Sequence, residues 1–291
     1  MSIVYLSGRA HTTDVIKRGD NAPFIAFRPY EPMDFLIHGF STRLGGVSQG
    51  KFSSMNLATN RDDDPECVRK NYEIIGQALG IRPEDMVYAK QTHTANVLHV
   101  TSGHKGMGIT KDRDFDNIDG LITDEPGVCL VTGYADCVPL FFADPVKRAI
   151  GLSHSGWRGT VSNIARVTIE KMHEDFGTEP KDIIAFIGPS ICRDHYEVGA
   201  DVADEFAGKY SDLKLNHILK SAGTVNGESK YHLNLHMACF YNITGSGVIP
   251  ENTYITDLCT FCNPGLFFSH RYTNGERGGM CGFLQLKQTQ T

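Results

Sequence analysis

Short runs of hydrophobic and β-branched residues recur along the chain, and most of them are bounded by glycine, aspartate or proline. Runs of this kind predict short β-strands. We expect strands at residues 24–27, 36–41, 86–89, 97–100, 120–123, 128–132, 138–142, 150–153, 183–187, 254–256, 267–269 and 281–286.

Helices are predicted where apolar residues recur every three or four positions. Residues 64–79 contain Pro65 at the start and end before Gly80, and both are typical helix boundary residues. Residues 160–176 show the same spacing, and two further helices are expected at 200–210 and 233–243. Many short strands with a few amphipathic helices predict an α/β fold, a mixed α/β sandwich with largely antiparallel strands.

The chain has 291 residues, which is enough for one large domain or two ordinary ones. It contains no internal repeat, low-complexity tract or long linker, so we expect a single domain over residues 1–291. Hydrophobic residues at 41% and charged residues at 21% exclude a disordered chain, a collagen and a coiled coil.

The charge balance indicates which kinds of partner the chain can bind. The 28 lysines and arginines are outnumbered by 34 acidic residues, and the formal net charge is −6. Without a basic cluster the chain is not expected to bind nucleic acid, which favours a small-molecule partner. Uninterrupted apolar runs such as residues 138–143 are far shorter than the roughly 20 residues of a membrane span. Residues 1–21 lack the apolar core of a secretory signal, so we expect a cytoplasmic protein without membrane contact.

The richest chemistry lies around a predicted hairpin. Asp144 and Pro145 form a turn between two apolar runs. A turn centred between residues 145 and 146 would place Cys137 directly opposite His154. Opposed residues have Cβ atoms about 4.5–5.5 Å apart, which lets a sulfur and an imidazole nitrogen bind one metal ion. The hairpin therefore predicts two metal ligands.

A third ligand is expected at His93, which follows a predicted strand at a polar bend. Three protein ligands leave a tetrahedral zinc one open position, which is the catalytic arrangement. A rival site is Cys259 with Cys262, which have the two-residue spacing of a zinc knuckle and could be joined by Cys281 or Cys239. Eight cysteines without an export signal do not predict disulfides. The other cysteines and histidines, His195 among them, are interpreted as structural or surface residues.

The segment after His154 predicts an anion site. Ser155, Trp157 and Arg158 lead with two glycines into a predicted helix, whose first N–H groups have no partners within the helix. The guanidinium of Arg158 suits phosphate or carboxylate. Alternatively, Ser155 and Thr160 only cap the helix and Trp157 packs in the core.

Several blocks together resemble a known family. They are His38–Gly46, Gln91–His93, Asp119–Thr123, Ala135–Pro139, His154–Gly159, Ile187–Cys192 and Ser269–Arg271. In this order, from about residue 38 to 284, they resemble the YfiH-like family. Its members are called multicopper polyphenol oxidases or laccase-domain proteins in older usage and purine nucleoside phosphorylases in later usage.

The resemblance implies a metal site at His93, Cys137 and His154. It also implies phosphorolysis of adenosine, inosine and methylthioadenosine, together with deamination of adenosine. Zinc is the expected metal and copper the alternative, because the chain has no His-x-His pair of the kind that builds a multicopper cluster. The expected partners are a purine nucleoside and phosphate, and the expected oligomeric state is a monomer or a homodimer.

The remaining site residues come from these blocks and from the residue chemistry around the predicted metal ligands. Arg43 and Arg158 are candidates for binding phosphate, and Arg43 is placed in the catalytic set. Asp136 is the nearest acid in sequence and is the candidate for proton transfer; if the strand continues through it, its side chain points away from Cys137 and its role is structural. The substrate-binding candidates are Gln91, Ser155, Trp157 and Arg158.

Two other classes of function stay open. In a metal-free cysteine hydrolase or amidase, His154 would deprotonate Cys137 for attack on an amide. A noncatalytic protein would use the same residues only to bind a purine or a metal.

Overall fold

The computed structural model describes residues 3–18 and 22–288, and its strands form two six-stranded sheets and one three-stranded sheet. The first large sheet has the order β1 (Thr13–Ile16), β2 (Phe24–Phe27), β3 (Leu36–Ser41), β15 (Met280–Leu286), β7 (Cys129–Tyr134) and β4 (Met86–Tyr88). The second has the order β14 (Thr253–Ile255), β10 (Ile184–Ile187), β8 (Val138–Asp144), β9 (Ala149–Ser155), β6 (Gly120–Thr123) and β5 (Val97–His99). The small sheet has the order β11 (Glu197–Gly199), β13 (Glu228–Leu233) and β12 (Leu219–Val225).

Most neighbouring strands are antiparallel, and the parallel pairs among the described strands are β4 with β7, β5 with β6 and β10 with β14. The α-helices are α1 (Pro65–Leu79), α2 (Trp157–Val161), α3 (Ile164–Phe176), α4 (Ala200–Ala207), α5 (Asp212–Ile218) and α6 (Leu235–Gly245). The expected mixed α/β sandwich with largely antiparallel strands is confirmed.

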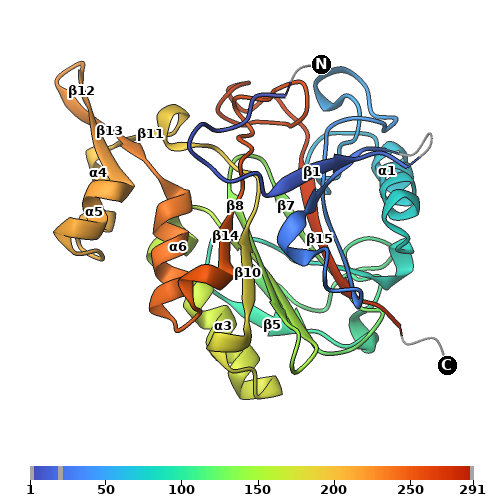
Figure 1. The fold of residues 1–291 in the computed structure, drawn as a ribbon. Helices are drawn as coiled ribbons and strands as arrows, with labels where there is room; N and C mark the ends of the chain where they lie inside the picture. The colour runs from blue at the N-terminus through green and yellow to red at the C-terminus, as the bar shows by residue number, and fades with distance from the viewer. Residues whose placement is uncertain (1–2, 19–21, 289–291) are drawn as a thin grey trace.

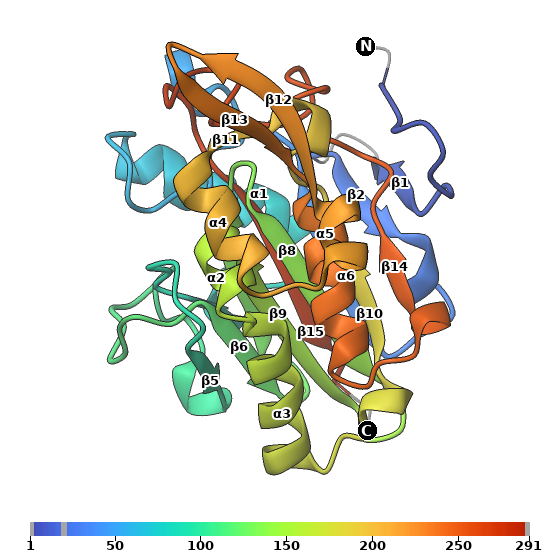
Figure 2. The ribbon, with the colours of Figure 1, turned by 90° about the vertical axis from the view of Figure 1, so that its left-hand side faces the viewer.

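The two large sheets pack face to face, and helices cover both outer faces (Figures 1 and 2). Phe141 and Leu284 point into the core between the sheets. Their chain neighbours point outward because side chains alternate along a strand. Phe283 packs with α1, and Phe142 lies in the cluster that contains α3 and α6. Both sheets are therefore buried on two sides, which explains why their strands form nearly continuous apolar runs.

Local boundary residues act as the sequence predicts. Asp64 caps α1 by accepting a hydrogen bond from the Glu66 N–H, and Gly80 ends the helix at φ 78°. The helix predicted over residues 160–176 is instead two helices, α2 and α3. Asn163, at φ 57°, breaks the helical path and caps α3 by accepting from the Arg166 N–H. The single-helix prediction was wrong because apolar spacing continues across this break.

Other predicted elements differ from the structure. Residues 267–269 form no strand, because Phe267 and Phe268 are buried from a loop and not paired in a sheet. The sequence did not predict β1, β11, β12, β13 or α5. The β12–β13 hairpin projects from the body of the molecule (Figure 1), and most of its residues are exposed or half-buried. Such strands lack the apolar alternation that identifies a strand in sequence.

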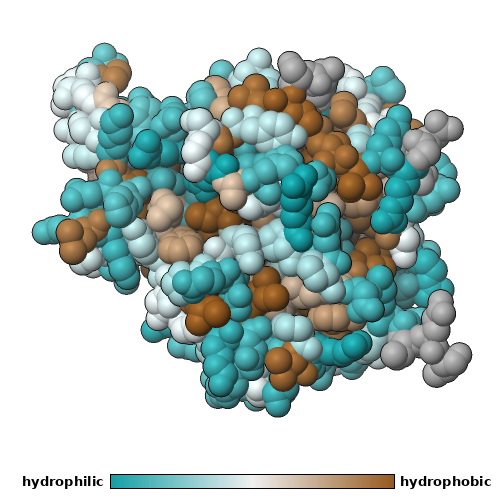
Figure 3. All heavy atoms as spheres, in the orientation of Figure 1, coloured by the Kyte–Doolittle hydropathy of each residue, from teal (hydrophilic) through white to brown (hydrophobic). Residues whose placement is uncertain are grey.

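The surface in Figure 3 mixes hydrophobic and hydrophilic residues on the face shown. Among the described residues, no helix is long and apolar enough to cross a membrane.

Candidate metal and anion site

Cys137 and His154 lie at the open end of the β8–β9 hairpin. The predicted direct opposition of these two residues was wrong, because the turn contains four residues and His154 pairs with Pro139. Cys137 immediately precedes β8 and is a diagonal neighbour of His154. The observed pairing is shifted by two residues from the predicted one, so the side chains of Cys137 and His154 stay on the same face of the sheet. Side chains of this size can reach a diagonal neighbour.

His93 joins the pair from the loop after β4. The ligand atoms of His93, Cys137 and His154 all lie within 4.8 Å of one another. Gly156 leaves the room for this cluster, since a Cβ at this position would lie 3.0 Å from His93 Cδ2 and 3.2 Å from Cys137 Sγ. One thiol and two imidazoles brought this close fit a tetrahedral metal ion with one position left open. The structure therefore brings together all three predicted ligands.

Asp119 organises two of these ligands, although the sequence analysis assigned it no role. Its carboxylate lies 2.8 Å from His154 Nδ1, which leaves Nε2 as the ring nitrogen for a metal. It also accepts hydrogen bonds from the backbone N–H groups of Thr92, His93 and Thr94 at 3.0, 3.1 and 2.9 Å. An acid directly before the buried strand β6 was the available signal.

The cluster favours an ionised cysteine. Burial disfavours the thiolate, but the charge of His154 and hydrogen bonds from His154 and His93 outweigh it and lower the pKa of Cys137 to about 6. Burial likewise opposes the charge on Asp119, yet His154 and the N–H donors hold its pKa at about 2. The resulting anionic environment, with a thiolate and a buried carboxylate, suits a divalent cation.

Two cavities meet at His93 and Cys137. The smaller, of about 170 Å³, lies beside Tyr88 and Met280. The larger, of about 420 Å³, falls in the usual size range of small-molecule sites. The larger cavity is rich in cationic side chains, and these are Arg61, Arg158, Arg271 and Arg277.

Arg277 lines both cavities. Among the described residues its buried Nε has no hydrogen-bond partner, and burial, followed by the charge of Arg61, lowers its pKa to about 10. Arg271 donates from Nη2 to the Glu197 carbonyl at 2.9 Å. An incompletely paired guanidinium among other cations favours an anionic ligand, because an unmet buried donor is costly. Arg61, Arg271 and Arg277 were not among the site residues expected from the sequence.

Arg43 does not line either cavity. Its guanidinium donates to the Ser53 carbonyl at 3.1 and 2.8 Å and to the Pro264 carbonyl at 2.9 Å, and it lies over the Phe268 ring. These bonds connect two loops and leave the side chain in a structural position. The structure therefore does not bring Arg43 together with the other predicted site residues.

The predicted substrate-binding residues divide into two groups. Gln91 borders the smaller cavity, but its amide exchanges two hydrogen bonds with the Gly133 backbone, and Ser155 is buried with its hydroxyl 2.8 Å from Thr160 Oγ1. Trp157 and Arg158 line the larger cavity, where the Arg158 guanidinium lies 4.2 Å from the centroid of the Trp157 ring system. Gln91 therefore holds the Gly133 backbone and Ser155 holds the Thr160 side chain, whereas Trp157 and Arg158 are available to a ligand.

Asp136 also borders the larger cavity, in a left-handed conformation at φ 85°. Its carboxylate accepts hydrogen bonds from Thr260 Oγ1 at 2.6 Å, Ser269 Oγ at 3.0 Å and the Arg271 N–H at 2.7 Å. These contacts fit the structural alternative for Asp136 better than proton transfer, because its oxygens hold the loop that carries the arginines.

Replacement of Asp119 with asparagine should weaken metal binding about 10- to 100-fold, the usual cost of losing a carboxylate that orients a ligating histidine. Titration of zinc against a competing chelator measures this. The control is Asp116→Asn, an exposed acid paired with Lys90 in the same region. Equal zinc affinity in the two variants would contradict the role given to Asp119.

The sequence family described as multi-copper polyphenol oxidoreductase laccase matches residues 37–287. Among curated relatives, purine nucleoside phosphorylase YlmD of Bacillus subtilis is 37% identical over 256 residues, covering 87% of this chain and 89% of the relative. Purine nucleoside phosphorylase LACC1 of Mus musculus is 30% identical over 272 residues, covering 91% of this chain and 58% of the relative.

Solved structures agree with this similarity. YfiH from Bacillus licheniformis has a TM-score of 0.86 and 30% identity, covering 94% of this chain and 99% of that one. YlmD from Geobacillus stearothermophilus has a TM-score of 0.84 and 31% identity, covering 94% of this chain and all (100%) of that one.

Proposed function

The chain belongs to the multi-copper polyphenol oxidoreductase laccase family, the YfiH-like family, and from this premise we propose that it is a zinc-dependent purine nucleoside phosphorylase that also deaminates adenosine. The observation that carries the proposal is the junction of a His/Cys/His cluster with an arginine-lined cavity. The curated relatives named as purine nucleoside phosphorylases support the phosphorolytic part. The proposed substrates are adenosine, inosine and methylthioadenosine.

His93, Cys137 and His154 would hold the zinc ion, and Asp119 would fix the ring of His154. When bound, zinc supplies Lewis-acid polarisation and activates a water molecule, which is the chemistry that deamination at C6 of adenine requires. Two imidazoles and one thiolate are ordinary zinc ligands, and zinc is therefore preferred here to copper.

Phosphorolysis forms a bond between a phosphate oxygen and C1′ of the ribose and breaks the bond from C1′ to the purine. The bonding electrons leave with the purine, which takes up the proton that the hydrogen phosphate loses. Arg271 and Arg277 would hold the phosphate, since guanidinium groups match its charge and geometry. Trp157, Tyr196 and Leu235 form an apolar part of the same cavity, where the flat base can pack. Positioning and electrostatics then provide most of the catalysis.

Incubation of the purified protein with adenosine and phosphate tests the proposal. We expect adenine, hypoxanthine and ribose 1-phosphate, and in buffer without phosphate we expect inosine alone. Chromatography of the bases and nucleosides measures both reactions. Binding of adenosine without any turnover would contradict the proposal and would favour the noncatalytic purine binder.

The second candidate is the cysteine hydrolase. It is favoured by one observation: the interaction of Cys137 with His154 lowers the pKa of the thiol, and despite burial Cys137 and Asp119 raise that of the imidazole to about 9. This hydrolase would be active in metal-free buffer and abolished by thiol alkylation. The proposed phosphorylase and deaminase would instead lose deamination with a chelator and recover it with zinc.

A further inference from the structure

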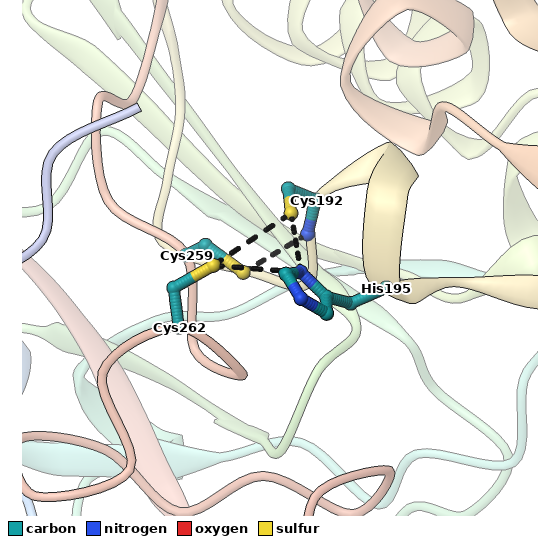
Figure 4. Close-up of side chains that lie close together, drawn as sticks. All are labelled: Cys192, His195, Cys259 and Cys262. Carbon is teal, nitrogen blue, oxygen red and sulfur yellow. Dashed lines mark hydrogen bonds between the residues drawn. The ribbon is translucent and has the colours of Figure 1, made fainter. Parts of the chain in front are cut away.

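A second group of ligand side chains shares no residue with the site above. Two residues separate Cys192 from His195 in one loop, and two residues separate Cys259 from Cys262 in another. Their ligand atoms converge from these two loops and all lie within 4.8 Å of one another (Figure 4). We propose that these four residues form a closed Cys₃His zinc site that holds the two loops together.

Cys259 and Cys262 form the rival pair expected from their spacing, but the expected additional ligands Cys239 and Cys281 were wrong. Cys239 lies instead beside Ser155, and Cys281 beside Tyr72, each at 3.6 Å. The two ligands that join the pair are Cys192 and His195, which had been interpreted as structural or surface residues. They are more than sixty positions earlier in the chain, so no short spacing motif identifies them.

The separations match a tetrahedral ion. Cys192 Sγ lies 3.2 Å from His195 Nδ1 and 4.0 Å from Cys262 Sγ, and Cys262 Sγ lies 3.5 Å from the same nitrogen. Ligands bound to zinc at about 2.3 Å for sulfur and about 2.0 Å for nitrogen stand about 3.5–3.8 Å apart. The observed distances fall on both sides of this range, and shifts of a few tenths of an ångström complete the tetrahedron.

The surroundings are those of a structural site. Cys192 and Cys259 are buried, and four protein ligands leave no position for water or substrate. The His195 ring stacks on Phe261, with 4.2 Å between centroids and 19° between planes, and this contact orients the imidazole. Phe261 itself lies between Cys259 and Cys262 in the chain.

The backbone also supports thiolate ligands. The Cys192 N–H donates to Cys259 Sγ at 3.2 Å, and Ser190 and Cys259 form an isolated parallel bridge. Three thiolates and a neutral imidazole around a divalent zinc have a net charge of −1. Burial lowers the pKa of Arg9, and the charge of Cys192 opposes this shift. Among the described residues the buried Nη1 of Arg9 has no hydrogen-bond partner. This guanidinium is suited to offset the net charge.

The two loops border the larger cavity of the candidate active site. One carries Ile191 and Tyr196, and the other continues to Arg271 and Arg277. Thr260, inside the second pair of ligands, donates to Asp136. A zinc ion bound here would therefore brace the arginine-bearing wall without touching the substrate.

The test counts zinc in the purified 291-residue chain, produced with added zinc and kept reduced. Cys259→Ser and Cys262→Ser should each lose one zinc per chain relative to Cys67→Ser, a control in the half-exposed cysteine of α1. The loss should be the same in a Cys137→Ala background, which separates this site from the candidate catalytic one. X-ray absorption at the zinc edge of the Cys137→Ala protein should show three sulfur ligands and one nitrogen.

Cys262→His covers the case in which a serine variant does not fold, because Cys262 is half-buried and histidine is also a ligand. In the Cys137→Ala background, the Cys262→His protein should keep its zinc, and the zinc ligands should change to two sulfurs and two nitrogens. Zinc content unchanged between Cys262→Ser and Cys67→Ser would overturn the proposal, and so would a disulfide between Cys192 and Cys262 in the freshly purified, zinc-supplied protein.

Discussion

Cys137→Ala is expected to lose one zinc ion per chain and to reduce deamination of adenosine by more than about 100-fold. Loss of a residue that only orients a ligand already lowers metal affinity or activity about 10- to 100-fold, and loss of a ligand itself should cost more. Cys137 supplies the single thiolate of the site, whereas His93 and His154 supply neutral donors. Elemental analysis and the rate of inosine formation without phosphate measure the two effects.

The matched control for this experiment is Cys67→Ala, which changes a cysteine on α1 outside both ligand clusters. Thermal unfolding should show a folded protein in both variants, because Cys137 only borders the large buried core and is not one of its fully buried members. A Cys137→Ala protein with the zinc content of the wild type would show that the thiol is not a ligand. Full activity of a metal-free wild-type protein would instead favour the cysteine hydrolase.

Arg277→Ala is expected to raise the KM for phosphate by about 10- to 100-fold. Hydrogen bonds to charged groups contribute about 1.5–3 kcal/mol, and Arg277 combines a buried, unpaired Nε with a position between the two cavities. Zinc content should stay unchanged. Deamination should be affected less than phosphorolysis, because no phosphate takes part in it.

Arg28→Ala is the control, since this arginine pairs with Asp14 at the surface and lines neither cavity. Arg277→Lys should restore only part of the phosphate affinity, because an ammonium group keeps the charge but lacks the planar pair of donors. Equal losses in phosphorolysis and deamination would mean that Arg277 holds the purine or the fold rather than the phosphate.

Hydrogen bonds that are made or missing with distant backbone groups explain why the roles of Arg43 and Arg277 were difficult to recognise from sequence. Arg43 belongs to a block that resembles the family and was the expected phosphate ligand, yet its donors are used by the carbonyls of Ser53 and Pro264. Arg277 lies in a loop without regular structure. Only the packing of neighbouring loops shows that its buried Nε has no hydrogen-bond partner among the described residues. The availability of a guanidinium depends on distant backbone groups that no local pattern reports.

The sequence by itself determined the elements that have strong local signals. Asp64 and Gly80 mark the ends of α1, and apolar runs mark most strands of the two large sheets, because capping and burial act within a few residues. It also indicated that Cys137 and His154 meet, since a hairpin brings nearby segments together whatever its exact register. His93 was identified by its place after a strand, with support from the family resemblance.

Only the tertiary structure decided the contacts between segments far apart in the chain. It placed Asp119 between His93 and His154, set the hairpin register through a four-residue turn, and joined Cys192 and His195 to Cys259 and Cys262. The physical reason is that periodicity reports which face of an element is buried but not which distant loop will pack against it. Loop lengths and the packing of the two sheets determine those partners.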